Sequence, residues 1–326
     1  MTSVRGDRSR GPSTAVAPAA SWPHGIWATA WRTVLRRVLR HVLTDRLMVQ
    51  SAAVAFFALL SIAPVLVTAI SVYGAVNTPE QALLQLSRAA GVLPADLNSV
   101  VAEQLRTITT ASTQVLTWRG LAALAVALWT ATTAMTYLID GLTIAYHEAE
   151  TRSFLRRSAL SLLFVLGGAV LLGAVIVVAS KSARWLAGAP APVQVLEPVL
   201  GWAVLAALMA EVLAVLYRFG PARRAARWRW ISGGSAIATL LWLATTIGLF
   251  AYVEGLGSYE ATYGSLAGVA ISMLWLWVTV CLVILGAVVN AETERETAWD
   301  STIGPDLPLG RRGAVVADST PPYPGD

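Results

Sequence analysis

Long hydrophobic runs without charge alternate with short charged segments along this chain. Six runs of twenty residues or more carry at most one charge each, and they cover residues 47–74, 120–139, 158–180, 198–217, 230–253 and 261–290. The hydrocarbon core of a bilayer takes about 20 helical residues to cross, and lipid cannot hydrogen-bond a bare peptide group. The pattern therefore predicts an all-α fold, a polytopic membrane bundle of six transmembrane helices.

Two further segments are amphipathic and too polar to span. Residues 31–43 alternate so that arginines occupy one helical side, and the apolar side comprises Val34, Leu35, Val38, Leu39 and Val42. This pattern predicts a helix lying in the membrane interface. Residues 80–108 also form one apolar helical face, which either caps the bundle or lies along the outer leaflet; packing against the bundle is favoured.

The two ends of the chain differ in composition from the rest. Residues 1–24 are rich in arginine, proline, alanine and serine, and residues 298–326 are rich in proline and glycine. Such compositions are typical of disordered segments. The sequence therefore predicts two disordered tails around a membrane domain at residues 25–297.

Overall composition supports a membrane protein and orients it. Hydrophobic residues make up 56% of the chain and charged residues 13%, whereas soluble domains carry about 25% charged residues. Of the 24 arginine and lysine residues, 19 lie before residue 47, in 141–157, in 218–229 or after residue 290. Because basic loops stay in the cytoplasm, we expect these segments and both termini to be cytoplasmic.

The stretch RFGPARRAARWRW at residues 218–230 admits two interpretations. Its five arginines and two tryptophans resemble a nucleic-acid patch. The favoured alternative is a short cytoplasmic loop between the fourth and fifth spans, whose arginines fix orientation or contact anionic lipid. On this interpretation Trp228 and Trp230 anchor at the headgroup boundary, and the chain binds no nucleic acid.

Polar residues inside the spans are candidate functional positions because burying them in lipid is costly. Glu211 interrupts the fourth run, and it is either a polar cavity wall or proton-linked site, or a structural glutamate that snorkels or bonds to a neighbouring helix. Ser61 lies three residues before Pro64 in the first run. The proline predicts a kink or a gating hinge, with the serine hydroxyl satisfying a freed carbonyl.

Small residues at a spacing of four predict close helix packing. They occur as Gly264 with Gly268 in the sixth run and as Gly234 with Ala238 in the fifth. We expect these pairs to serve packing inside one monomer, and a homo-oligomer contact stays open.

Residues for catalysis are scarce. Cys281 is the only cysteine, and the only histidines are His24, His41 and His147, which are scattered along the sequence. A metal-dependent nuclease needs several closely spaced ligands, and no glycine-rich phosphate loop or catalytic triad is present. The sequence predicts no enzymatic activity, no cofactor and no metal site.

Four stretches together resemble the YihY/BrkB family of bacterial inner-membrane proteins, formerly labelled ribonuclease BN. They are VAFFALLSIAPV (54–65), LIDGLTIAYHEAETRSFLRR (138–157), LYRFGPARRAARWRWISGG (216–234) and SYEATYGSLAGVAISMLWLWVTVCLVILGA (258–287). The last is the most specific, with Tyr259 and Tyr263 in matching positions. The chain departs from the family at Val288, where a glutamate is frequent, and at Thr143, where an asparagine is frequent; Asn290 lies near the first departure.

The resemblance implies six helices in the bacterial plasma membrane and a transporter-like role in handling a lipid or other amphipathic envelope component. The alternative is a non-transporting scaffold for envelope proteins, and a ribonuclease is the least favoured. Membrane lipids and envelope proteins are the expected partners. Candidate residues along a substrate path are Glu211, Ser61, Pro64, Tyr259, Tyr263 and Asn290.

Overall fold

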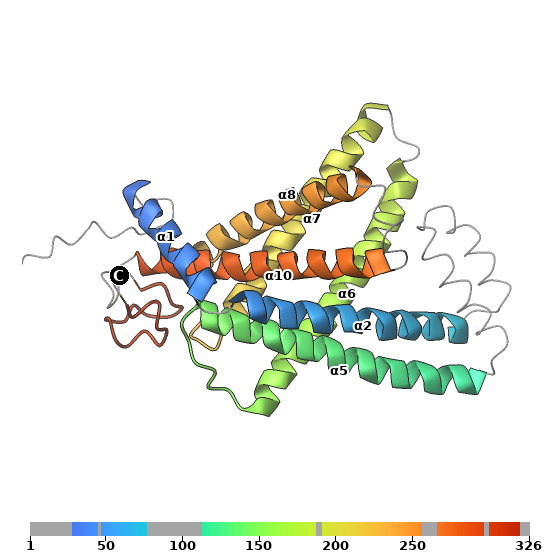
Figure 1. The fold of residues 1–326 in the computed structure, drawn as a ribbon, viewed down its shortest axis with the longest axis horizontal. Helices are drawn as coiled ribbons and strands as arrows, with labels where there is room; N and C mark the ends of the chain where they lie inside the picture. The colour runs from blue at the N-terminus through green and yellow to red at the C-terminus, as the bar shows by residue number, and fades with distance from the viewer. Residues whose placement is uncertain are drawn as a thin grey trace, which may run out of the picture.

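The computed structural model describes residues 28–44, 47–76, 113–186, 191–255, 266–296 and 300–319. Within these ranges the regular structure is helical. The helices are α1 (Ala28–Thr44), α2 (Leu47–Val76), α5 (Thr113–Ala145), α6 (Phe154–Leu186), α7 (Ala191–Phe219), α8 (Ser232–Gly255) and α10 (Leu266–Arg295), and a 3-10 turn η2 (Trp228–Trp230) precedes α8 (Figure 1). The predicted residues Tyr259 and Tyr263, the segment 80–108 and the N-terminal tail 1–24 lie outside the described ranges.

The prediction of six spanning helices is confirmed. Each of the six hydrophobic runs lies mostly within one helix of the described structure, and six helices are long and apolar enough to cross a membrane. Successive spans run in opposite directions, so that α2, α6 and α8 begin where α5, α7 and α10 end. We call this the basic end; it also contains α1 and the connections 146–153 and 220–231.

Helix α10 occupies the middle of the bundle and packs against α1, α2, α5 and α8. Helices α2 and α5 lie side by side along their lengths, whereas α6 diverges from the others (Figure 1). The outward faces carry exposed apolar side chains such as Leu163, Val170 and Leu172 on α6. In a bilayer such faces contact lipid, so their exposure costs nothing there.

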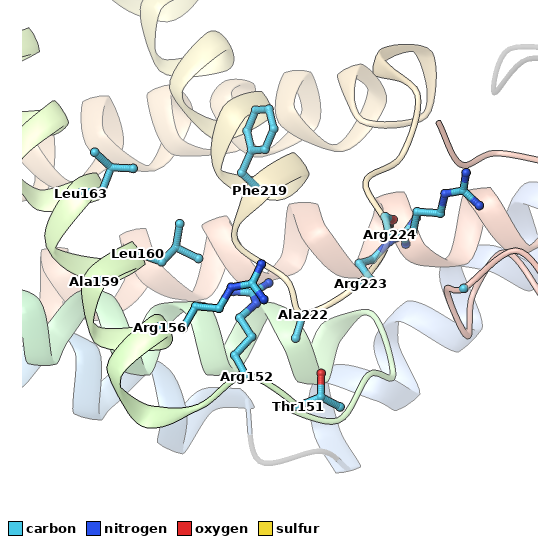
Figure 2. A pocket seen from close by; sticks show the side chains of 11 residues that line it. Thr151, Arg152, Arg156, Ala159, Leu160, Leu163, Phe219, Ala222, Arg223 and Arg224 are labelled. Carbon is cyan, nitrogen blue, oxygen red and sulfur yellow. Dashed lines mark hydrogen bonds between the residues drawn. The ribbon is translucent and has the colours of Figure 1, made fainter. Parts of the chain in front are cut away.

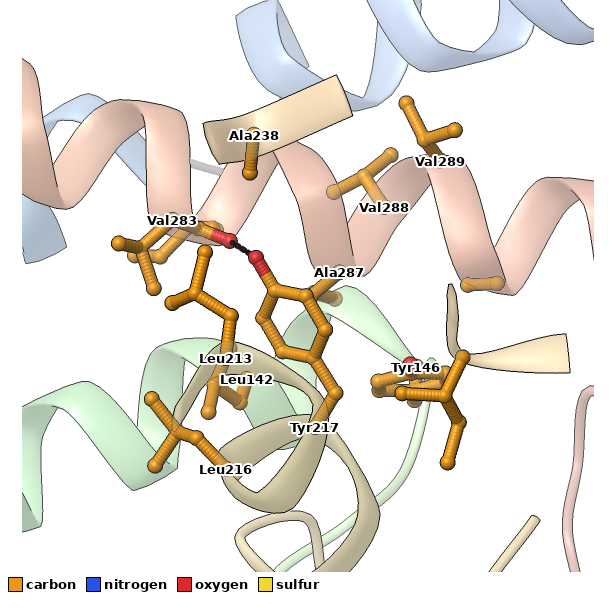
Figure 3. Packing of buried hydrophobic residues seen from close by; sticks show 14 of the residues in the cluster. Leu142, Tyr146, Leu213, Leu216, Tyr217, Ala238, Val283, Ala287, Val288 and Val289 are labelled. Carbon is orange, nitrogen blue, oxygen red and sulfur yellow. Dashed lines mark hydrogen bonds between the residues drawn. The ribbon is translucent and has the colours of Figure 1, made fainter. Parts of the chain in front are cut away.

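The buried core gathers towards the basic end. Tyr217 of α7 reaches across it, and its hydroxyl donates a hydrogen bond of 2.6 Å to the carbonyl of Val283 in α10 (Figure 3). Leu142, Leu213, Ala287 and Val288 belong to the same cluster. Because a buried phenol needs a partner, this bond fixes the end of α7 against the middle part of α10.

Helices α8 and α10 cross closely at small residues. A Cβ atom added to Gly286 would lie 2.7 Å from both the Gly234 carbonyl oxygen and the Ala238 Cβ, and a Cβ on Gly234 would also clash with the Gly286 carbonyl. The predicted packing role of Gly234 and Ala238 is therefore confirmed. Gly268 has no heavy atom within 4 Å of an added Cβ in the described structure, so it serves no such crossing there.

Helix α1 uses only half of its predicted apolar side against the protein. Val34 and Val38 are buried, whereas Leu35 is 67% exposed and Leu39 is 60% exposed. The helix therefore docks on α10 by one edge and presents a second apolar edge outward, which suits a helix at a lipid boundary.

The C-terminal segment differs from the disordered tail that its composition predicts. Residues 300–319 pack on the basic end, where the Arg227 N–H donates to the Ser301 carbonyl at 2.8 Å. Asp300 accepts hydrogen bonds from the N–H groups of Thr302 and Leu307, at 2.9 Å each. The prolines and glycines here form turns, as at Gly304 with a φ of 108°, and hydrogen bonds between turns leave no periodic pattern in the sequence.

Burial and hydrogen bonding have opposite effects on the pKa of Asp300. Burial by itself would raise the pKa of its carboxyl, but the N–H donors of Leu307 and Thr302 stabilise the ionised form and hold the pKa below its usual value. The charged form of Asp300 therefore contributes to anchoring the segment.

Candidate functional site

A pocket of about 650 Å³ opens between the first turns of α6 and the loop that follows α7. Figure 2 shows side chains of α6 on one side and those of the loop on the other. Its residues are Thr151, Arg152, Arg156, Ala159, Leu160, Leu163, Phe219, Ala222, Arg223, Arg224 and Gly313. The lining contains four arginines and includes neither a carboxylate nor a histidine.

Arg152 holds the pocket together. Its guanidinium donates to the carbonyls of Gly220, at 2.9 Å, and of Pro221, and so ties the start of α6 to the loop after α7. Burial lowers the pKa of Arg152; Glu150 raises it, and the charge of Arg156 lowers it. Two like charges thus share one side of the pocket.

Arg156 is the accessible cation of this pair. Its side chain is exposed, and no carboxylate of the described residues lies within ion-pair distance of it. In Figure 2 its guanidinium and that of Arg152 point toward each other in the space of the pocket. Because like charges repel, an anion between the two groups would be bound favourably.

The side of the pocket farther from the basic end is apolar. Leu160 and Leu163 follow Arg156 along α6, and Phe219 is the last residue of α7 (Figure 2). Leu163 and Phe219 are exposed; Phe219 is the last residue of its span, whereas Leu163 lies inside the span Phe154–Val175. The pocket therefore joins a cationic part at the helix ends to an apolar part within the spans.

Behind the pocket, Arg223 forms a buried ion pair with Glu294 of α10. Its two terminal nitrogens lie 3.0 and 2.6 Å from the two carboxylate oxygens, and the side chains are 2% and 1% exposed. Ser301 donates to the same carboxylate at 2.5 Å. Burial by itself would lower the pKa of Arg223, but Glu294 raises it above its ordinary value. Because Glu294 neutralises the charge of Arg223, this arginine stabilises the loop. The exposed positive charge of the pocket is that of Arg156.

The two tryptophans of the loop have different environments. Trp228 is exposed, and the guanidinium of Arg218 lies 4.3 Å from its ring centre. Trp230 is buried. The predicted headgroup anchor is therefore wrong for Trp230, which packs inside the protein because η2 turns it inward.

None of the candidate residues from the sequence that the structure describes lines this pocket. Glu211 lies on the exposed surface of α7. Helix α2 continues through Pro64, and Ser61 donates to the carbonyl of Ala58 at 2.6 Å. The carbonyl that loses its partner to Pro64 is that of Leu60, four residues earlier. The expected bond from Ser61 to a freed carbonyl is therefore wrong.

Asn290 is buried and joins two helices. Its side-chain oxygen accepts from the Gly234 N–H at 2.7 Å, and its amide donates to the Ile231 carbonyl at 3.0 Å. The first N–H groups of a helix lack partners within it, so Asn290 supplies one for α8. Both polar groups of its side chain are thereby used in holding the bundle.

Two of the histidines that are scattered along the sequence lie together in the structure. His41 of α1 and His147 after α5 stack with ring centres 4.3 Å apart, and the Nε2 atom of His147 lies 3.4 Å from a carboxylate oxygen of Glu292. Linear spacing could not show this because α1 folds back onto the ends of α5 and α10.

Sequence reasoning also missed Arg152 and Arg156 as residues that line a pocket. A signal was present, since basic residues precede leucines at the start of the third run and a second basic cluster follows the fourth run. The alternation of spans predicts that both clusters lie at the same end of the bundle, but only the bonds from Arg152 to the carbonyls of Gly220 and Pro221 show that they meet.

Comparisons with known proteins identify a family. The profile of the family described as Virulence factor BrkB matches residues 38–306. A Bacillus subtilis protein named ribonuclease-like protein YfkH is 28% identical over 171 residues, which cover 51% of this chain and 62% of the relative. A UPF0761 membrane protein of Paraburkholderia xenovorans is 23% identical over 256 residues, which cover 75% and 56%.

This chain thus matches little more than half of the length of either relative. No solved structure matches it. The family match takes in all six spanning helices of the described structure, the pocket-lining residues except Gly313, and the first residues of the C-terminal segment. With six apolar spans and a family match over most of its length, the chain belongs to the BrkB family of membrane proteins.

Proposed function

We propose that this protein handles an anionic amphiphile of the cell envelope, and that the amphiphile binds in the pocket between α6 and the loop after α7. The negatively charged head group lies between Arg152 and Arg156, and an acyl chain lies along Leu160, Leu163 and Phe219. The observation that carries this proposal is the junction of cationic and apolar lining in one pocket at the limit of the spans.

The chemistry of the lining supports a phosphate-bearing head group. A guanidinium presents its N–H donors in a planar fork that matches phosphate oxygens, and such charge-assisted bonds are strong. A free phosphate would satisfy the arginines but leave the apolar part of the pocket without an occupant. A lipid satisfies both.

The same lining favours binding over hydrolysis. One relative carries the name ribonuclease-like, but the pocket is lined by no histidine or carboxylate that could act as a general base. We propose that the protein is not a nuclease. Incubating pure protein with RNA and divalent metal should give no cleavage above that of an Arg156→Gln control.

A binding measurement tests the site. Protein in zwitterionic nanodiscs should bind added phosphatidylglycerol more tightly than added phosphatidylcholine. Arg156→Gln should weaken phosphatidylglycerol binding by about tenfold, since a lost charged hydrogen bond is worth roughly 1.5–3 kcal/mol. The control is Arg36→Gln, which removes one exposed positive charge from α1 outside the pocket.

Competition separates lipid from free anion. Inorganic phosphate at millimolar concentration should displace little lipid, because it gains nothing from the apolar wall. Equal binding of the two lipids, or equal weakening by Arg156→Gln and Arg36→Gln, would contradict the proposed site.

Movement of lipid between the two leaflets distinguishes a transporter from a scaffold. A transporter-like protein in proteoliposomes should carry a labelled anionic lipid between leaflets, and Arg156→Gln should slow this. Binding without movement would favour the scaffold. If the protein is a scaffold, Glu211→Gln and Pro64→Ala should leave its function unchanged, so both variants should complement a deletion of the gene.

We also infer that the protein resides in the bacterial plasma membrane with its basic end in the cytoplasm. The support is that 19 of the 24 basic residues lie in the sequence segments before residue 47, in 141–157, in 218–229 or after residue 290, because basic loops stay in the cytoplasm. A C-terminal green fluorescent protein fusion should be fluorescent, and a C-terminal alkaline phosphatase fusion should be inactive. The reverse result would place the pocket on the other side of the membrane.

A further inference from the structure

Three side chains with metal-binding atoms converge at the basic end, apart from the pocket. They are His41 of α1, His147 in the connection after α5, and Glu292 of α10, and one ligand atom from each lies within 4.8 Å of the others. The proposed function gives these three residues no role, because none of them lines the pocket.

The distances approach those of a coordination site. Ligands about 2.0–2.1 Å from a tetrahedral zinc ion lie about 3.4 Å apart. His147 Nε2 and a Glu292 oxygen are separated by 3.4 Å. His41 is stacked on His147 at an interplanar angle of 18°, and a turn of its ring would bring a nitrogen into the same shell.

The backbone at His147 is unfavourable for a histidine and suited to glycine. His147 has a φ of 56°. Its N–H bonds to the Ile144 carbonyl at 2.8 Å, and the Glu148 N–H bonds to the Thr143 carbonyl at 3.0 Å. These two bonds form the Schellman ending of α5, in which glycine is the usual residue at this position. Glycine would adopt this positive φ with less strain than histidine, so the backbone conformation does not explain why a histidine is present here.

A cation already occupies the space between two of the ligands. The Nη1 atom of Arg295 lies 3.1 Å from His147 Nε2 and 3.0 Å from the Glu292 oxygen. A guanidinium can only donate, so in the tautomer of His147 that carries its proton on Nδ1 the Nε2 lone pair faces Arg295. In that tautomer the lone pairs of His147 and Glu292 converge on one positive centre, as they would on a metal ion.

We propose that His41, His147 and Glu292 bind a divalent transition-metal ion, with zinc as the best match for two imidazoles and a carboxylate, and that binding displaces the Arg295 guanidinium. Water completes the coordination, since these residues supply three ligands. The ion would fasten α1 to the ends of α5 and α10.

Metal titration of tag-free, chelator-treated protein tests this site. Zinc chloride should bind with a stoichiometry of one and raise the thermal unfolding temperature, while magnesium chloride should do neither, because magnesium prefers oxygen ligands. His147→Gly should weaken zinc binding by at least about tenfold and abolish the thermal shift. Without metal it should unfold no earlier than the wild type, because glycine suits the left-handed backbone.

Two further variants complete the design. Arg295→Gln should bind zinc more tightly, because a competing positive charge is removed. His24→Ala, which changes the remaining histidine, should bind zinc as the wild type does. Failure of the wild type to bind zinc, unchanged zinc binding by His147→Gly, or weaker binding by Arg295→Gln would overturn the proposal. Lipid binding by the same proteins is a separate measurement, so either proposal can fail alone.

Discussion

At the scale of single residues, the arginines of the loop after α7 have different partners. The sequence identifies them as a basic cluster but not their individual partners. Arg223 is buried against Glu294, and Arg227 pairs with Asp306 at 2.6 Å, so these two fasten the C-terminal segment and α10 to the loop. Net charge alone would have counted both as free to hold lipid or RNA.

Glu294→Gln should destabilise the protein strongly. It leaves Arg223 buried without its anion, and breaking a buried pair from one side costs about 3–5 kcal/mol. Asp306→Asn is the control, because its pair with Arg227 is far more exposed, at 66% and 33%, and its loss should cost about 1 kcal/mol or less. Unfolding of both variants in detergent measures the difference; equal stability would show that burial of the first pair does not matter.

At the scale of elements, periodicity predicts each helix but not its neighbours. All six spans were predictable, because a lipid-facing helix must be apolar over its whole crossing. The helix partners depend on local contacts such as Gly234 against Gly286 and Asn290 against the start of α8. Only the spacing of small residues hints at these contacts, and that spacing also occurs where no crossing follows, as at Gly268.

Gly286→Ala should force α8 and α10 apart. The new methyl group would collide with Ala238 and the Gly234 backbone of α8, and also with the Tyr217 hydroxyl of α7; overpacking of this kind costs about 1–3 kcal/mol. Gly233→Ala is the control in the same helix pair, since an added Cβ there has nothing within 4 Å and should be neutral or mildly stabilising. The two melting temperatures, measured in the same detergent, should therefore shift in opposite directions or differ clearly in size.

The C-terminal segment should detach on acidification. The folded state holds the pKa of Asp300 below its ordinary value, so the carboxylate contributes stability above the unfolded pKa of about 3.9. That contribution is lost as pH falls through the still lower folded pKa. Hydrogen exchange of residues 300–319, corrected for the intrinsic effect of pH, should report this loosening, and Asp300→Ala should show it already at neutral pH. Equal protection in the variant and the wild type would contradict the role of Asp300.

At the scale of the whole molecule, the chain combines an apolar membrane bundle with a dense polar layer at one end. The bundle was predictable from composition and run length. The polar layer was not, because its contacts join α1, the connections and the C-terminal segment across long distances in sequence, as in the approach of His41 to His147 and Glu292. The pocket belongs to this layer, since Arg152 and the loop after α7 form it jointly.

Photocrosslinking tests the central claim, that an anionic lipid occupies this pocket. Protein in bilayers that contain a phosphatidylglycerol with a photoreactive acyl chain would be illuminated, digested and mapped by mass spectrometry. We predict that label concentrates on the start of α6, around Leu160 and Leu163, and near Phe219, and that Arg156→Gln removes it. Label spread evenly over the other exposed apolar faces, such as that of α2 around Phe56, would contradict the account.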